Sequence, residues 1–298
     1  MSELEAHDGI WKDSLPRHRR GQAPVCQDYV RGVESALPDL CGDQGVMGSR
    51  PEIYDVMYAM EDSYWWYRGL RRIAFSLLER YYPSAHDLTI LEAGCGTGGF
   101  LQQLANLGWP LGLDRSSDAL KYCVERGIPP HHLMLGSTDT LPYRSELFDL
   151  IACIDVLCCL DDDAQALKEF HRVLKPGGRL LLNLPALEIL GGEHDRAWAD
   201  YVHRYTAGEL RSKLERAGFI VERLTYINTI LFPIALFVRL RKRLLSSGNP
   251  SGVPSSDLKP LPPFLNEILV HIFGFEATLL KFMSFPIGVS LIAVVKKP

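Results

Sequence analysis

The chain has 298 residues, of which 47% are apolar and 23% charged, a composition that suits one large globular domain or two small ones. Its 32 Lys and Arg residues against 36 Asp and Glu residues give a net charge of -4, which disfavours nucleic acid as a partner. Seven cysteines without CxxC spacing suit neither a secreted disulfide framework nor a zinc site, so we expect a cytoplasmic protein without metal. No run of about 18 uncharged apolar residues is present to span a bilayer.

The N-terminal part divides into two segments. Residues 1–50 mix charges, Gly and Pro with few clustered apolar positions, and we expect a poorly ordered or peripheral arm. Residues 51–298 are expected to form one domain. Apolar residues at three- and four-residue intervals over residues 51–82 predict two successive helices that lead towards a strand.

Short apolar runs then alternate with helix-like segments, which predicts a parallel sheet buried on both faces. A Thr cap at residue 206 with Glu209 three positions later starts a further helix, which the β-branched run FIVERLTYIN follows. GVSLIAVVKKP closes the chain as another strand. We therefore expect an α/β, doubly wound sheet of about seven strands. The earlier strands are LTILEAG, WPLGLDR, HHLMLG, FDLIACIDVL and RLLLNLP.

A glycine-rich loop follows the first of these strands. In LEAGCGTGGF, Gly94, Gly96 and Gly99 satisfy the GxGxxG pattern, whose glycines let the backbone turn tightly and approach a ligand. The pattern alone also suits an NAD-dependent oxidoreductase, so the rest of the sequence must decide between cofactors.

Residues 92–98 (EAGCGTG) resemble the first motif of class I S-adenosylmethionine-dependent methyltransferases, with an acidic residue two positions before the first glycine. Residues 175–178 (KPGG) resemble that family's turn into its fifth strand. The resemblance covers residues 51–228 and 288–297 and is nearest to the type 11/12-like bacterial enzymes that methylate small molecules or lipids. It implies a Rossmann-like sheet with an antiparallel last strand, S-adenosyl-L-methionine as cofactor and a small-molecule or lipid-linked acceptor.

The resemblance also implies a set of cofactor-binding residues. Glu92 would lie near the ammonium group of the cofactor, which has no phosphate for a carboxylate to repel. Asp114 closes the second strand, where its carboxylate can accept both hydroxyls of a ribose. Ser137 stands where many relatives have Asp, and Cys158 and Cys159 replace the usual Glu and His, so we assign the cysteines no catalytic role. The expected set is Glu92, Gly94, Cys95, Gly96, Gly98, Asp114, Arg115, Ser137, Thr138 and Asp155.

Residues 60–68 (MEDSYWWYR) form an aromatic cluster at helical spacing, which in most proteins packs in the core. Similar helices cover the cofactor site in some bacterial methyltransferases, where aromatic faces attract a sulfonium cation. Tyr64 and Tyr67 are therefore expected as substrate or lid residues, with core packing as the alternative. We add Tyr205, which lies in HRYT, residues that resemble the family's short motif before its last helix, with a structural role as the alternative.

The best candidate for a catalytic base is His194, which follows the fifth strand at the carboxyl edge of the sheet. With an ordinary pKa of about 6.5, it could take a proton from an acceptor, and Asp195 or Glu193 could orient it. The alternative is a histidine of a surface loop without a catalytic role.

Residues 229–287 separate the last two strands and are longer than a usual connection, so they form an insertion. Residues 229–245 combine an apolar decade with a basic cluster of Arg239, Arg241, Lys242 and Arg243. They could lie in a membrane interface with anionic lipids or form a lid helix over the pocket. Both interpretations favour an apolar or lipid-linked acceptor.

Three functions stay open on the sequence. The first is S-adenosylmethionine-dependent methyl transfer to a small, apolar or lipid-linked acceptor. The second is an NAD-dependent oxidoreductase, which Glu92 and the turn at residues 175–178 oppose. The third is a non-catalytic module that associates with a membrane partner through residues 229–245, in which case a cytoplasmic protein would bind the inner face of the membrane.

Overall fold

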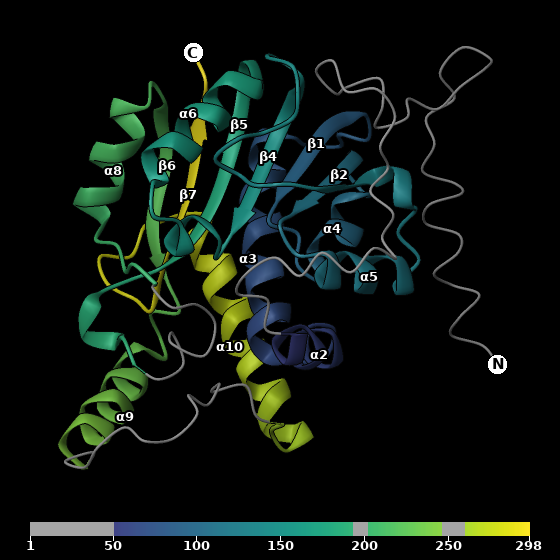
Figure 1. Ribbon diagram of the computed structural model, residues 1–298. Helices are drawn as coiled ribbons and strands as arrows, with labels where there is room; N and C mark the ends of the chain where they lie inside the picture. The colour runs from purple at the N-terminus through teal and green to yellow at the C-terminus, as the bar shows by residue number, and fades with distance from the viewer. Residues whose placement is uncertain (1–50, 193–201, 246–259) are drawn as a thin grey trace.

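The computed structural model describes residues 51–192, 202–245 and 260–298, so the predicted arm over residues 1–50 lies outside the described residues. A seven-stranded sheet has the order β3-β2-β1-β4-β5-β7-β6 (Figure 1). β7 pairs antiparallel with β5 and β6, and the other pairs are parallel, which confirms the predicted fold class. The strands are β1 (Leu88–Ala93), β2 (Gly108–Asp114), β3 (Leu133–Leu135), β4 (Phe148–Ile154), β5 (Leu174–Pro185), β6 (Ile220–Ile227) and β7 (Ser290–Lys296).

The central strands are apolar at consecutive positions because helices cover both faces of the sheet. On β5, Leu180 and Leu182 join the core beneath α6 (Asp163–Val173) and α8 (Ala207–Arg216). Leu181, between them, faces the opposite core beneath α3 (Trp65–Tyr81) and α10 (Pro263–Leu280). The alternation along one strand thus builds two cores that share a single sheet.

Several of the helices that connect the strands begin at a residue whose side chain caps the helix. The Ser116 hydroxyl accepts the backbone N–H of Ala119 at 3.3 Å and starts α5 (Ser117–Glu125). The Asp162 carboxylate and the Thr206 hydroxyl start α6 and α8 in the same way. These bonds satisfy helix N–H groups that have no partner within the helix, which is why Ser, Asp and Thr mark the starts.

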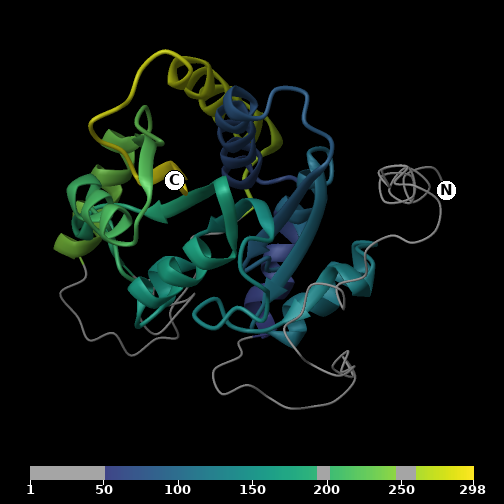
Figure 2. The same cartoon turned by 90° about the horizontal axis from the view of Figure 1, so that it is seen from above.

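The helical preface and the insertion lie side by side, although about 200 residues of sequence separate them. Figure 2 shows α3 and α10 together on one face of the sheet. The rings of Trp65 and Trp66 meet Phe273 edge-on, with centroids 5.3 Å and 5.7 Å apart, and the Trp65 backbone N–H donates to Asn266 Oδ1 at 2.8 Å. The remaining preface and insertion helices are α2 (Pro51–Met60) and α9 (Phe232–Leu245), and α4 (Gly99–Leu104) follows β1.

Gly69 permits this close packing, because a Cβ at this position would overlap the Phe273 side chain. We predict that Gly69→Ala lowers the free energy of unfolding by about 1–3 kcal/mol through overpacking. Gly208→Ala, in α8, is the control. A Cβ there would meet nothing within 4 Å, so the change should stabilise the protein by up to about 1 kcal/mol. Urea denaturation compares the two variants, and equal effects would contradict the packing argument.

Candidate functional site

The glycine-rich loop turns sharply between β1 and α4. Gly94, Gly96 and Gly98 have φ values of +83°, +52° and +86°. Residues other than glycine rarely adopt backbone angles in this region. A Cβ on Gly94 would overlap Val156, and one on Gly96 would lie 3.1 Å from the sulfur of Met57. The loop is therefore held between Val156, which follows β4, and helix α2, and neither position has room for a larger side chain.

Asp114 lies at the carboxyl end of β2 and is 8% exposed. Its Oδ2 accepts the Gly96 N–H at 2.8 Å and its Oδ1 accepts the Ser116 N–H at 2.9 Å. Burial raises the pKa of Asp114 despite these bonds, and burial together with the Asp114 charge raises the pKa of Tyr54, on α2, to about 12. Each Asp114 oxygen keeps acceptor capacity for one more donor, which suits a pair of hydroxyls.

Glu92, on β1, is 3% exposed, and its Oε2 has no hydrogen-bond partner among the described residues. Burial raises its pKa well above the usual range, and Cys123, Glu61 and Asp114 raise it further. A buried carboxylate oxygen without a partner is costly, so it marks a place where a donor is missing. The Thr138 hydroxyl, in the loop after β3, is a second buried polar group without a partner in the described part of the chain.

A network of hydrogen bonds ties the helical preface to the glycine-rich loop. The Thr97 hydroxyl donates to Glu61 Oε1 at 2.7 Å, and Arg126 Nε donates to the Thr97 carbonyl oxygen at 2.9 Å. Arg126 also forms ion pairs with Glu61 and with Asp62, the latter at 2.6 Å. Arg71 donates to the Glu61 carbonyl oxygen at 2.5 Å. Sequence analysis missed Glu61 and Arg126, because no spacing rule links residues so far apart.

Asp155 follows β4 with a φ of +56°, a strained conformation for a residue with a side chain. Its Oδ1 accepts Asn183 Nδ2 at 2.8 Å, yet burial raises the pKa of Asp155 to about 7. Burial also raises the pKa of Tyr67, with added contributions from Glu61 and Asp155. Tyr67 therefore lies among the carboxylates of this site, and its role as a substrate or lid residue stays a prediction.

The other predicted residues divide into two groups. Tyr64 is 9% exposed and lies near Tyr67, and Arg115 is exposed beside Asp114. Tyr205 is 1% exposed and its hydroxyl donates to Asp163 Oδ2 at 2.8 Å between α6 and α8. The structure thus places Tyr205 in the core and not with the glycine-rich loop, which corrects its expected role as a substrate or lid residue.

Three further predictions concern cysteines, Ser137 and the candidate base. The sulfur atoms of Cys158 and Cys159 lie 3.7 Å apart as free thiols, and Cys158 is buried, as expected for side chains that pack in the core. Ser137 hydrogen-bonds Asp139 and lowers the pKa of that carboxyl group. His194 falls outside the described residues.

Comparison with known proteins identifies the fold and the loop. Residues 91–182 match the family model of a methyltransferase domain. A probable S-adenosylmethionine-dependent methyltransferase of Mycolicibacterium smegmatis is 29% identical over 65% of this chain and 70% of its own length. A phthiotriol/phenolphthiotriol dimycocerosates methyltransferase of Mycobacterium ulcerans is 33% identical over 36% of this chain and 42% of its own.

The chain contains a class I S-adenosylmethionine-dependent methyltransferase domain. It spans less than half the length of several curated relatives that it matches. Among solved structures, a candidate methyltransferase in complex with the Trm112 methyltransferase activator of Haloferax volcanii shares the fold. Its TM-score is 0.53 at 20% identity, over 84% of this chain and all of that one. The methyltransferase match supports S-adenosylmethionine as the cofactor of this domain.

The described residues of this methyltransferase domain fit that cofactor. Glu92 offers a buried acceptor without a partner to an ammonium group, and Asp114 offers two acceptors to ribose hydroxyls. We predict that Asp114→Asn weakens the binding of S-adenosylhomocysteine by about 10- to 100-fold, because it removes charge-assisted hydrogen bonds. Asp118→Asn, nearby in the first turn of α5, should leave affinity unchanged. Isothermal titration calorimetry decides, and equal affinities for the two variants would remove Asp114 from the site.

Asp155 gives a pH-dependent prediction. Because its folded-state pKa is about 7 and an unfolded Asp titrates at about 4, the folded state binds more protons between these values. The contribution of Asp155 to the free energy of unfolding therefore decreases as the pH rises from about 4 to about 7. Asp155→Asn should flatten this fall in urea denaturation, whereas Asp161→Asn, at an exposed position, should not. An unchanged slope in Asp155→Asn would show that this carboxyl group titrates normally.

Proposed function

We propose that this protein transfers the methyl group of S-adenosylmethionine to a small, apolar or lipid-linked acceptor. The observation that carries the proposal is the buried Glu92 oxygen without a partner, close to the carboxylates of Glu61 and Asp114. Such a concentration of carboxylates favours a ligand that carries positive charge, and it repels the pyrophosphate of a dinucleotide. When bound, the cofactor supplies an electrophilic methyl group on a positively charged sulfur atom.

The chain's own residues would hold the cofactor and enclose the reacting groups. Glu92 would accept hydrogen bonds from the ammonium group, and Asp114 would accept those of the ribose. Helix α2 lies against the loop with Met57 and against Asp114 with Tyr54, and it would help to exclude water from a bound cofactor. Alignment of the acceptor with the methyl group then supplies most of the rate enhancement.

Two groups are candidates for a proton acceptor. Asp155 has a pKa of about 7, so about half of its population is ionised at neutral pH. His194, which follows the fifth strand in the sequence, is the second candidate. We propose that whichever faces the acceptor takes its proton. Asp155→Asn and His194→Ala therefore identify the base once an acceptor is known.

The nature of the acceptor is inferred from helix α9. This helix contacts the 3₁₀ turn Glu188–Leu190, just after β5, at the edge of the sheet where doubly wound folds bind ligands. Ile234 and Phe237 on α9 are 63% and 67% exposed. We propose that residues 229–245 contact an apolar acceptor or the membrane that carries it, on the cytoplasmic face. The lipid substrate in the name of the Mycobacterium ulcerans relative supports this choice.

Methyl-labelled S-adenosylmethionine tests the proposal. We expect the purified protein to transfer label to a component of a bacterial lipid extract that partitions into organic solvent. Asp114→Asn should lose at least about nine-tenths of this transfer at a fixed, subsaturating cofactor concentration, and Asp118→Asn should keep it. Cofactor binding without transfer to any lipid or water-soluble extract would contradict methyl transfer and favour a non-catalytic module.

A further inference from the structure

The outer surface of α10 is apolar and exposed. Phe264, Ile268 and Phe275 are 69%, 51% and 59% exposed and recur at spacings of four and seven residues, so they form one stripe. Phe282, just beyond the helix, is 83% exposed. The inner face packs into the core with Phe273, Ala277 and Leu280, and Val270 on the same helix is also buried.

By length and composition α10 could cross a membrane. Its contacts favour a different arrangement. Glu276, fully buried on α10, accepts the backbone N–H groups of Thr229 at 2.9 Å and Ile230 at 3.2 Å, which fixes the start of the insertion. The helix is thus part of the domain core, and only its outer stripe is available to a partner.

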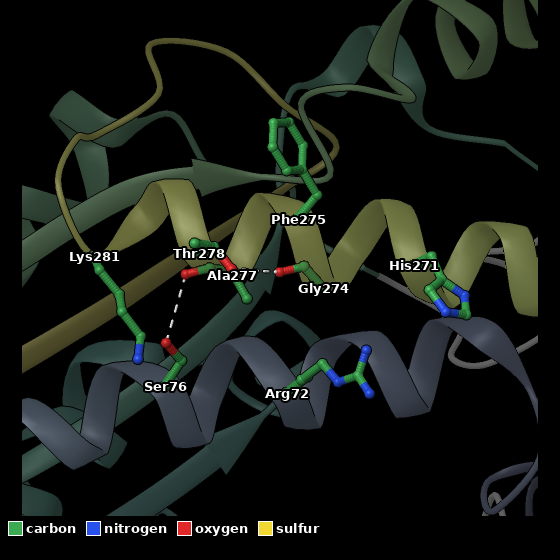
Figure 3. A pocket seen from close by; sticks show the side chains of 8 residues that line it. All are labelled: Arg72, Ser76, His271, Gly274, Phe275, Ala277, Thr278 and Lys281. Carbon is green, nitrogen blue, oxygen red and sulfur yellow. Dashed lines mark hydrogen bonds between the residues drawn. The ribbon is translucent and has the colours of Figure 1, made fainter.

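Two grooves flank this stripe. One, of about 480 Å³, lies between α3 and α10 and contains Arg72, His271 and Lys281 with the hydroxyls of Ser76 and Thr278 (Figure 3). No carboxylate among the described residues lines it. The other, of about 460 Å³, is lined by four apolar residues and by His271. The apolar residues are Ile230, Ile268, Ile272 and Phe275.

The cations of the first groove are available to an anion. Arg72 forms no ion pair with any carboxylate among the described residues. Lys281 meets Glu79 at 3.4 Å, but both side chains are largely exposed, at 49% and 71%, so the pair is weak. The other nearby acid, Glu267, is paired with Arg68. The chain as a whole has a net charge of -4, so the positive charge of this groove is a local feature.

The two grooves share His271 and Phe275, so cationic and apolar chemistry meet on one surface. We propose that this surface docks onto a membrane that contains anionic phospholipid. The headgroup phosphate faces Arg72 and Lys281, and the acyl region meets Phe275 and Ile268. A second copy of the chain fits less well, because a two-fold contact centred here would bring the two cationic grooves together.

The position of the surface suits this role. Figure 1 shows α9 and the N-terminal half of α10, which carries Phe264 and Ile268, projecting at the same end of the molecule, whereas the cationic groove lies along the C-terminal half of α10. Docking does not require methyl transfer, so it can be measured separately from the proposed function.

Vesicle flotation tests the docking surface. The full chain should float with vesicles of phosphatidylcholine and phosphatidylglycerol, and much less with phosphatidylcholine alone. Arg72→Gln combined with Lys281→Gln should lower the partition onto anionic vesicles by about tenfold or more, and so should Phe264→Ser combined with Phe275→Ser. The matched controls are Lys121→Gln with Arg211→Gln and, for the apolar pair, the exposed Ile220→Ser.

S-adenosylhomocysteine should raise the unfolding temperature of every variant equally, which shows that folding and the cofactor site are intact. Equal flotation of wild type and both double variants would overturn the proposal, as would equal binding of neutral and anionic vesicles. A dimer that the Phe264→Ser and Phe275→Ser changes dissociate, without vesicle binding, would assign the surface to a second copy. Loss of cofactor binding with flotation intact would contradict the proposed function and leave the docking surface standing.

Discussion

The structure depends on a concentration of buried carboxylates at the carboxyl edge of the sheet. Burial raises the pKa values of Glu61, Glu92, Asp114 and Asp155, and the charges of Glu61 and Asp114 raise the pKa of Glu92 further. Charges of one sign are tolerated in a site of low dielectric constant only when partners of opposite charge balance them. The charges of Arg126 and Arg71 lower the pKa of Glu61, and Arg126 forms an ion pair with it, whereas Glu92 keeps an oxygen without a partner among the described residues. That imbalance is what a cofactor with ammonium and sulfonium groups would relieve.

The same carboxylates join the domain's parts. Glu61 comes from the junction between α2 and α3, yet it binds Thr97 in the glycine-rich loop and Arg126 after α5. Tyr54 and Met57, one turn or two earlier, lie against Asp114 and Gly96. Helix α2 therefore covers the cofactor site, and its contacts with the residues of that site hold the helix in place. A ligand that enters or leaves must displace α2 or pass beside it, which links cofactor exchange to the stability of this network.

Much of the fold could be predicted from the sequence because local patterns determine it. Several features depend only on residues that are close together in sequence. They are the apolar runs of the strands, the helix caps at Ser116 and Thr206, and the glycines with positive φ. The Glu61–Arg126 pair, the packing of α3 on α10 and the pKa of Asp155 arise from segments far apart in sequence, so no periodicity indicates them. Tyr205 was assigned wrongly for a related reason: a short motif does not reveal that its hydroxyl faces Asp163 in the core.

The central claim is that this carboxylate-lined site takes a positively charged sulfur cofactor. Thermal unfolding with S-adenosylmethionine, S-adenosylhomocysteine or NADH tests it most directly. A ligand at about one hundred times its dissociation constant adds about 2.7 kcal/mol to the free energy of unfolding, which raises the midpoint by several degrees. The account predicts such a shift with both sulfur compounds and none with NADH. A shift with NADH alone, or none with either sulfur compound, would contradict it.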